Sequence, residues 1–383
     1  MRILMVAPRA FPSVGGVQTH VHHLSRELGG LGITSDILAP AHDGALPLDE
    51  MLDGVRYLRV PQLLNSEHLG IAPAIGRVAR QLESNYDLLH VHGYHATPAL
   101  FAASAWRKPI VFTPHFHGSG HSAFRRLLHH GYRFAGTRLF SKSAAVVAVS
   151  SAERRLLCAS FPVVSDRISV VSNGVSVDEL RSARPFAKSE VAMHSDSRVV
   201  LFAGRLETYK RVDRVVRAFG ELPEGYELVI VGDGTARRDL ESLAQSMPNG
   251  RQIRFLGQIS TPTLRRWTRT ASVFASFSEH EAQSIVLLEA LAIGLPAVAS
   301  RIPAHESVAS LAPDRISLVD AADSPSRVAA AVMAAATLPS RPVEVPTWRT
   351  VAQENAAIYR SVLEAEHSAW SESFDGPSMK AAV

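Results

Sequence analysis

Residues 276–300 read SFSEHEAQSIVLLEALAIGLPAVAS, which is the pattern of a strand end, a polar turn, a helix and a second strand. The apolar run ends at Phe277. The next four residues, Ser-Glu-His-Glu (278–281), are polar and charged and would not lie in a core strand. Ser284 stands at an N-cap position for a helix over Ile285 to Ala292, which ends at Gly294-Leu295-Pro296. The stretch therefore predicts a strand–helix–strand unit with a polar loop at its first strand end.

Two carboxylates lie eight residues apart in this unit. Glu281 falls on the loop, whereas Glu289 falls in the second turn of the helix among apolar neighbours. Because an unpaired buried carboxylate is costly, Glu289 either pairs with an arginine or faces a cleft. The start of the helix, at Ser284 and Ile285, adds free N–H groups and a positive dipole end, a ready site for phosphate. A sugar nucleotide would suit these groups, but an amphipathic helix with no further role is an equal alternative.

Length and composition indicate a two-domain globular protein. The 383 residues exceed one ordinary core and fit two domains of roughly 170–190 residues. Hydrophobic content of 46% and charged content of 20% are those of a soluble protein, and the single Cys158 excludes an intramolecular disulfide. The net charge of +4 suits an anionic substrate or a membrane surface, and we expect no nucleic-acid partner. No signal peptide or membrane-span pattern is visible, so we expect a cytoplasmic protein, with peripheral contact at the inner membrane face left open.

Short apolar segments alternate with helical patterns along the chain, and a polar stretch over 181–196 separates two such series. This alternation predicts an α/β fold with doubly wound parallel sheets, whose ligands bind beyond the carboxyl ends of the strands. The predicted strands are 3–7, 33–39, 55–60, 88–91, 110–113, 145–149 and 168–171 in the first half, and 199–203, 226–231, 253–256, 272–277, 297–299 and 316–319 in the second.

The predicted strand ends of the first half carry glycines and histidines. Gly15-Gly16 follow the first strand and let a ligand approach the backbone, unless they form a plain flexible turn. His90 and His92 end one strand, and His115 and His117 follow the next. A zinc-dependent hydrolase built on His90, His92 and His115 is one hypothesis, although the further ligands that it needs are missing from later strand ends. Hydrogen bonding to substrate hydroxyls is the interpretation that we favour.

Two basic features suit anions. Arg205 and Lys210 follow the strand over 199–203 and would converge at the carboxyl edge of the sheet, where they could grip a diphosphate or form surface salt bridges. Residues 124–142, FRRLLHHGYRFAGTRLFSK, interleave basic and aromatic side chains. An amphipathic helix of this composition could rest on an anionic membrane, or it could be a solvated helix with a stripe that faces the core.

Together these landmarks resemble the retaining glycosyltransferases of family 4, which have the GT-B fold. The motifs in order are GGV (15–17), DLLHVH (87–92), FTPHFHG (112–118), VSNGV (171–175), GRLETYKR (204–211), VGDG (231–234), RFLG (254–257) and EAQSIVLLEA (281–290), and the last fits the family's E-x7-E pattern. The resemblance implies two Rossmann-like parallel-sheet domains facing across a cleft, with residues 1–180 for the acceptor and 181–345 for the nucleotide sugar. A helix over 346–367 would cross back to the first domain, and we expect 368–383 to be disordered.

The resemblance also implies a role for each matching residue. His115 would lie near the anomeric carbon, and Glu281 would bind a hydroxyl of the donor sugar. Arg205 and Lys210 would neutralise the diphosphate, with the helix start at Ser284 and Ile285 beside them. The other implied roles are ribose binding by Glu289, backbone approach to phosphate or acceptor at Gly16, and acceptor binding by Gly15, His92 and His117.

The implied reaction is transfer from a nucleotide-diphosphate sugar to a hydroxyl of a glycan, lipid-linked or small-molecule acceptor. Two fixed cations and a helix N-terminus can stabilise the leaving diphosphate, so we expect neither a metal nor a cofactor. A front-face retaining mechanism lets the leaving phosphate take the acceptor's proton. Ala282-Gln283-Ser284 stand where many relatives read Gly-Phe-Gly. Gln283 could bond a sugar hydroxyl, and the altered loop also keeps open a nucleotide-sugar-binding protein without catalysis.

Overall fold

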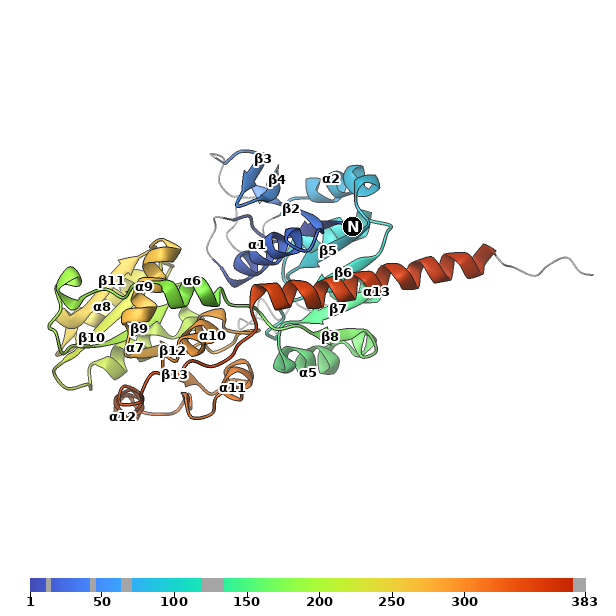
Figure 1. Cartoon of the computed structure of the whole chain (residues 1–383). Helices are drawn as coiled ribbons and strands as arrows, with labels where there is room; N and C mark the ends of the chain where they lie inside the picture. Colours follow the sequence, from blue (N-terminus) through green and yellow to red (C-terminus); the bar gives the residue numbers. More distant parts are fainter. Residues whose placement is uncertain (12–14, 42–45, 63–70, 119–133, 375–383) are drawn as a thin grey trace, which may run out of the picture. The chain divides into compact units, whose positions relative to one another are not determined.

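The computed structural model describes residues 1–11, 15–41, 46–62, 71–118 and 134–374 (Figure 1). The chain divides into two compact units: unit 1 comprises Met1–Ser172 with Trp348–Val383, and unit 2 comprises Asn173–Thr347. Unit 2 thus begins before the expected boundary at 180/181. The physical reason is that Leu180, on α6 (Val177–Ser182), is buried in the core of unit 2, and the neighbouring Arg181 donates hydrogen bonds to the carbonyl of Ala292.

Unit 1 is built on a sheet with strand order β3-β4-β2-β1-β5-β6-β7-β8. Neighbouring strands are parallel except β3 and β4, which pair antiparallel at one edge. The order reverses between β1 and β5, and such a switch point is where ligands bind in doubly wound sheets. The strands are β1 (Arg2–Val6), β2 (Thr34–Ala41), β3 (Asp49–Leu52), β4 (Val55–Pro61), β5 (Leu88–His92), β6 (Ile110–Thr113), β7 (Ala145–Ala148) and β8 (Ile168–Val170).

The helices of unit 1 include α1 (Gly16–Gly29), α2 (Ala74–Leu82), α3 (Thr97–Ala105), α5 (Ser151–Ser160) and α13 (Trp348–Phe374). Helix α13 packs against α1 (Figure 1), and its Tyr359 is fully buried. Residues 368–374, where we expect disorder to begin, belong to this helix, which no glycine or proline interrupts before Gly376. Residues 375–383 lie outside the described residues.

Most of the expected membrane-contact segment, residues 124–133 of 124–142, also lies outside the described residues. Residues 134–142 are helical, with Phe134 exposed and Phe140 fully buried. Within the described ranges, no helix is long and apolar enough to cross a membrane. Peripheral contact through 124–142 stays a prediction.

Unit 2 contains a wholly parallel sheet of order β11-β10-β9-β12-β13-β14, with its switch point between β9 and β12. Two apolar cores cover its two faces. The strands are β9 (Arg198–Ala203), β10 (Tyr226–Val231), β11 (Ile253–Gly257), β12 (Val273–Ser276), β13 (Ala297–Ser300) and β14 (Ile316–Val319). Besides α6, the α-helices are α7 (Val212–Phe219), α8 (Arg237–Gln245), α9 (Thr261–Thr270), α10 (Ile285–Ala292), α11 (Pro303–Ala309) and α12 (Pro325–Ala335).

Candidate active site

The candidate donor site of unit 2 lies at the switch point of its sheet, where the loops after β9 and β12 meet. Lys210, in the 3-10 turn Thr208–Lys210 after β9, places its Nζ 2.5 Å from Oε1 of Glu281. The Ser278 hydroxyl donates a second hydrogen bond, of 2.8 Å, to the same oxygen. The two partners of the ion pair are 17% and 15% exposed. Both contacts use Oε1, so neither of them occupies the other carboxylate oxygen of Glu281.

The electrostatics of this pair favour its charged form. Burial works to raise the pKa of Glu281, but Lys210, His305 and the Ser278 hydroxyl together lower it below its usual value. Burial likewise works to lower the pKa of Lys210, and Glu281 raises it above its usual value. Both side chains are therefore ionised at neutral pH.

Glu289 differs from Glu281 in having no cation of its own. Burial raises the pKa of the Glu289 carboxyl to about 7, against an opposing influence of Arg265. Arg265 forms its ion pair with Glu179 instead. Glu289 takes part in no hydrogen bond or ion pair with the described residues, so an arginine does not satisfy it as the simpler interpretation required. A half-buried carboxylate in this state is suited to accepting hydrogen bonds from ligand hydroxyls.

Arg205 and Lys210 both contact one tyrosine, Tyr209. The Arg205 guanidinium donates a 2.8 Å hydrogen bond to the Tyr209 hydroxyl, and Lys210 Nζ lies 5.3 Å from the centre of the same ring. The imidazole of His280 stacks on this ring, 4.7 Å between centroids. The structure thus holds the two cations beside each other through Tyr209, a residue that the sequence analysis did not select although it stands between them in the motif.

The loop before α10 is shaped without positive φ angles. Among the described residues other than glycine, positive φ occurs at Asp53, His115, Ala192 and Arg211 and not in this loop. Ser284 is the N-cap residue of α10, with φ of −91°, but its side chain makes no capping hydrogen bond. The Gln283 side-chain carbonyl accepts a 2.7 Å hydrogen bond from the backbone N–H of Asn173. This hydrogen bond ties the loop to the VSNGV motif, and a bond from Gln283 to a sugar hydroxyl stays a prediction.

One supporting residue was missed from the sequence. His305, on α11, is fully buried, and its Nδ1 donates a 2.9 Å hydrogen bond to the Ser300 carbonyl. The Ser300 hydroxyl in turn donates to the Ser278 carbonyl at 2.5 Å. His305 therefore anchors the backbone of the loop that carries Glu281, and a lone histidine after Pro303 gave no sequence signal for this role.

The candidate acceptor site of unit 1 is a histidine cluster at the ends of β5 and β6. His92 ends β5, and its Nδ1 lies 3.4 Å from Nε2 of His115 in the loop after β6. His20, on α1, packs its ring against both, at centroid distances of 5.5 and 5.1 Å. Burial, followed by the neighbouring histidines, holds the pKa of His92 and of His115 well below the usual value. These imidazoles are therefore neutral at physiological pH and can hydrogen-bond without adding charge.

One histidine of the zinc-hydrolase hypothesis, the alternative to our expectation of no metal, is engaged elsewhere. Both nitrogens of His90 are engaged, Nδ1 with the Tyr359 hydroxyl at 2.7 Å and Nε2 with the Thr113 hydroxyl at 2.8 Å. His20 takes its place, and the ligand nitrogens of His20, His92 and His115 lie within 4.8 Å of one another. Because both nitrogens of His90 already have partners, the site that the hydrolase hypothesis needs is not formed as expected, and the hypothesis has no support.

The remaining expected residues of unit 1 are Gly15, Gly16 and His117. A Cβ added at Gly16, the first residue of α1, would have no atom within 4 Å, whereas one at Gly15 would meet the Gln18 side chain at 2.4 Å. The backbone at Gly16 is thus open to a ligand. His117 is half-buried, and its ring lies 5.3 Å from that of His95.

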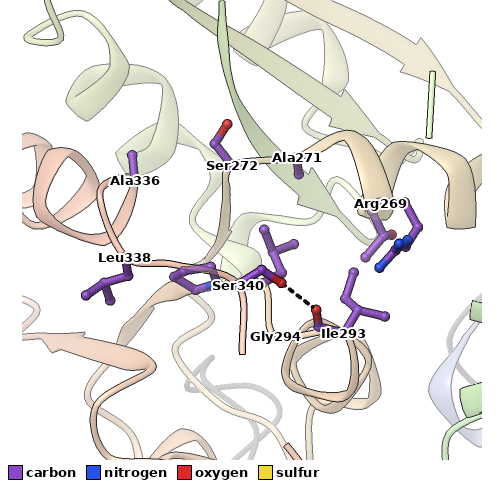
Figure 2. Close-up of a pocket in the computed structure, with 11 residues that line it drawn as sticks. Arg269, Ala271, Ser272, Ile293, Gly294, Ala336, Leu338 and Ser340 are labelled. Carbon is purple, nitrogen blue, oxygen red and sulfur yellow. Dashed lines mark hydrogen bonds between the residues drawn. The ribbon is translucent and has the colours of Figure 1, made fainter. Parts of the chain in front are cut away.

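A separate cavity of about 270 Å³ lies at the amino ends of strands β12 and β13 in unit 2 (Figure 2). Its lining includes Ser272 and Pro296, which precede β12 and β13, and the Ser340 hydroxyl donates a 3.0 Å hydrogen bond to the Ile293 carbonyl there. Ligands of such sheets bind at the carboxyl ends of the strands, so we do not include this cavity in the candidate site.

Comparison with known proteins agrees with this arrangement. The model of "Glycosyltransferase Family 4" matches residues 14–179, and that of "Glycosyl transferases group 1" matches 184–339. The phosphatidyl-myo-inositol mannosyltransferase of Mycobacterium leprae is 32% identical over 317 residues, 80% of each chain. The D-inositol 3-phosphate glycosyltransferase of Xylanimonas cellulosilytica is 29% identical over 315 residues, 75% of this chain and 76% of the relative. Anabaena HepE, solved with UDP-glucose, superposes with a TM-score of 0.71 at 15% identity, over 96% of this chain and 100% of its own.

Fold and matches together define a glycosyltransferase with the GT-B fold. The chain belongs to the family 4 glycosyltransferases.

Proposed function

We propose that this glycosyltransferase moves a sugar from a nucleotide-diphosphate sugar to a hydroxyl acceptor, with retention of the anomeric configuration and without a metal. Unit 2 binds the donor and unit 1 binds the acceptor. The observation that carries the proposal is the set of polar groups at the switch point of unit 2: the Lys210–Glu281 pair at 2.5 Å and the Glu289 carboxyl without a cation.

The donor is held by groups that match its parts. Glu289 accepts hydrogen bonds from the ribose hydroxyls, and the other carboxylate oxygen of Glu281 accepts one from the sugar. Arg205 and Lys210, which both contact Tyr209, neutralise the diphosphate. The N-terminus of α10, at Ser284 and Ile285, lies in the same strand–helix connection as Glu281 and adds its dipole. The solved complex of HepE with UDP-glucose supports a UDP-sugar as the first donor to test.

The chemistry of this site stabilises the leaving group. Breaking the glycosidic bond develops negative charge on the diphosphate, and cations that are already fixed in place stabilise that charge without reorganising. His115 lies near the anomeric carbon and, being neutral, offers a hydrogen bond and no charge. The leaving phosphate oxygen takes the acceptor's proton on the same face, so retention needs no separate carboxylate base.

The acceptor that we propose is an inositol or one of its phosphates. Support comes from the relatives, one a phosphatidyl-myo-inositol mannosyltransferase and the other a D-inositol 3-phosphate glycosyltransferase. The ring hydroxyls of an inositol suit the neutral imidazole of His92, and we assign His117 and the backbone of Gly15 and Gly16, open at Gly16, to the same acceptor.

The test is a thermal-shift panel of UDP-, GDP- and ADP-sugars, each with and without a chelator. A donor that binds the folded chain raises the melting temperature by mass action, and we expect one nucleotide class to do so regardless of the chelator. Glu289→Ala should abolish the shift, whereas Arg301→Ala, a surface change in the same unit, should keep it. No shift with any nucleotide sugar, or a shift that the chelator removes, would overturn the proposal.

A further inference from the structure

A buried carboxylate, that of Glu153, is hydrogen-bonded to the loop that carries His115 of the histidine cluster. Glu153, the third residue of α5, is 2% exposed. Its Oε1 accepts a 2.5 Å hydrogen bond from the backbone N–H of Phe116, and its Oε2 accepts one of 2.6 Å from the N–H of Val149. Glu153 thereby joins the loop after β6 to the end of β7.

This use of Glu153 differs from the one that its sequence position suggests. Ser150 caps α5, and its hydroxyl accepts a 3.0 Å hydrogen bond from the Glu153 N–H. In a capping box the glutamate would return the bond to the N–H of the capping serine. Here its two oxygens accept hydrogen bonds from the backbone N–H groups of Phe116 and Val149 instead. The carboxylate therefore connects the residues that follow β6 and β7.

The bond to Phe116 reaches the backbone of His115. The Phe116 N–H belongs to the peptide group that follows His115, so fixing its direction fixes the ψ angle of His115. That residue has φ of +49°, in the left-handed region that residues other than glycine rarely adopt. A strained backbone persists where its surroundings hold it, and the Glu153 carboxylate is such a restraint.

We propose that Glu153 is a positioning residue: through the Phe116 N–H it holds His115 in the left-handed conformation that aims its imidazole at the reacting sugar. The inference rests on the proposed function, which places His115 near the anomeric carbon.

Burial of the carboxylate without a cation is consistent with this role. Glu153 forms no ion pair within the described residues, and burial raises the pKa of its carboxyl to about 7 against the two backbone N–H groups. The Ser150 cap is sufficient to start α5. Helix formation therefore does not explain why the chain bears the free-energy cost of burying a carboxylate at position 153.

The test compares Glu153→Gln with Ser150→Ala. The glutamine keeps the shape but offers a single acceptor oxygen, so one of the two backbone N–H groups loses its bond. Ser150→Ala removes the helix cap and leaves both carboxylate bonds in place, which makes it the matched control for lost stability. We expect Glu153→Gln to lower kcat by about tenfold to a hundredfold with the donor KM unchanged, because small misplacements of a reacting group have effects of that size. Ser150→Ala should keep kcat.

A second measurement does not depend on turnover. The imidazole C–H resonances of His115, assigned with a His115→Ala variant, should shift in Glu153→Gln and stay in place in Ser150→Ala. In a His115→Ala background, Glu153→Gln should cause no further loss of kcat. If Glu153→Gln does not fold, Glu153→Asp, which keeps both acceptor oxygens on a shorter side chain, takes its place in both measurements.

Three results would overturn the positioning role: an unshifted His115 resonance, an unchanged kcat in Glu153→Gln, or an equal loss in Ser150→Ala. Failure of the proposed function looks different. The wild-type chain would then transfer no sugar from any donor, while the His115 resonance would still show whether Glu153 holds the loop.

Discussion

Replacing Lys210 by methionine tests the ion pair at the centre of the donor site. Methionine keeps much of the length of the side chain and removes the charge that lies 2.5 Å from Glu281. Glu281 would keep the Ser278 hydroxyl at 2.8 Å as its remaining contact in the structure. The substitution therefore leaves a carboxylate that is only 15% exposed without its cation.

The expected loss of stability follows from this burial. Removing one partner of a buried ion pair costs about 3–5 kcal/mol, and the residual exposure of both side chains places this pair near the lower limit, about 3 kcal/mol. For a domain of this size each kcal/mol shifts the melting temperature by about 2–4 °C, so we expect a fall of about 6–12 °C. Turnover should fall by about a hundredfold to a thousandfold, the usual effect of removing one fixed group that stabilises developing charge.

Thermal and urea unfolding of Lys210→Met, Glu281→Gln and the double variant measure this interaction as a cycle. The double variant should recover about 2 kcal/mol relative to the sum of the single changes. Arg301→Met is the control, because its 2.9 Å pair with Asp320 is about half exposed and should contribute less than about 1 kcal/mol. If Lys210→Met is as stable as Arg301→Met, or the cycle shows no coupling, the assigned ion pair is wrong.

Three further predictions follow from individual contacts. Glu289→Gln should weaken nucleotide-sugar binding about tenfold. The wild-type affinity should fall as the pH drops below about 7, because the Glu289 carboxyl, whose pKa is raised, then takes a proton and loses an acceptor. A flat pH profile of the affinity in calorimetry would contradict this role. Gly16→Ala should keep the melting temperature, since the added Cβ has no neighbour within 4 Å, yet lower kcat/KM by crowding the ligand; unchanged kinetics would exclude a close approach there. Tyr359→Phe removes the hydroxyl bonded to His90 and should lower the free energy of unfolding by about 1–3 kcal/mol in urea, whereas equal stability would show that this bond contributes nothing.

The elements that the sequence predicts best are those with a mostly apolar run between turn residues. Helix α10 and strands β6, β10 and β14 have the expected bounds for this reason. Strand β3 was missed because DEML has no apolar run and is exposed along much of its length, paired antiparallel at the edge of the sheet. An edge strand of this kind is fixed by its partner and not by its own composition.

The sequence predicts those parts of the candidate site that directly follow a strand. Lys210 and Glu281 follow strands that flank a switch point, so the topology alone brings them near each other. Their direct pairing was not predictable, because either side chain could equally have faced a ligand. His20 and Glu153 were missed for a related reason: each lies on a helix, and only the folded chain shows which loop it meets.

The central claim is sugar transfer with retention, and the configuration of the product tests it most directly. The chain would be incubated with the nucleotide sugar that binds best, an inositol acceptor and a chelator, and the product analysed by mass spectrometry and by NMR of its anomeric proton. The account predicts an acceptor heavier by one sugar, with the donor's anomeric configuration. A product of inverted configuration, or release of free sugar without transfer, would contradict it.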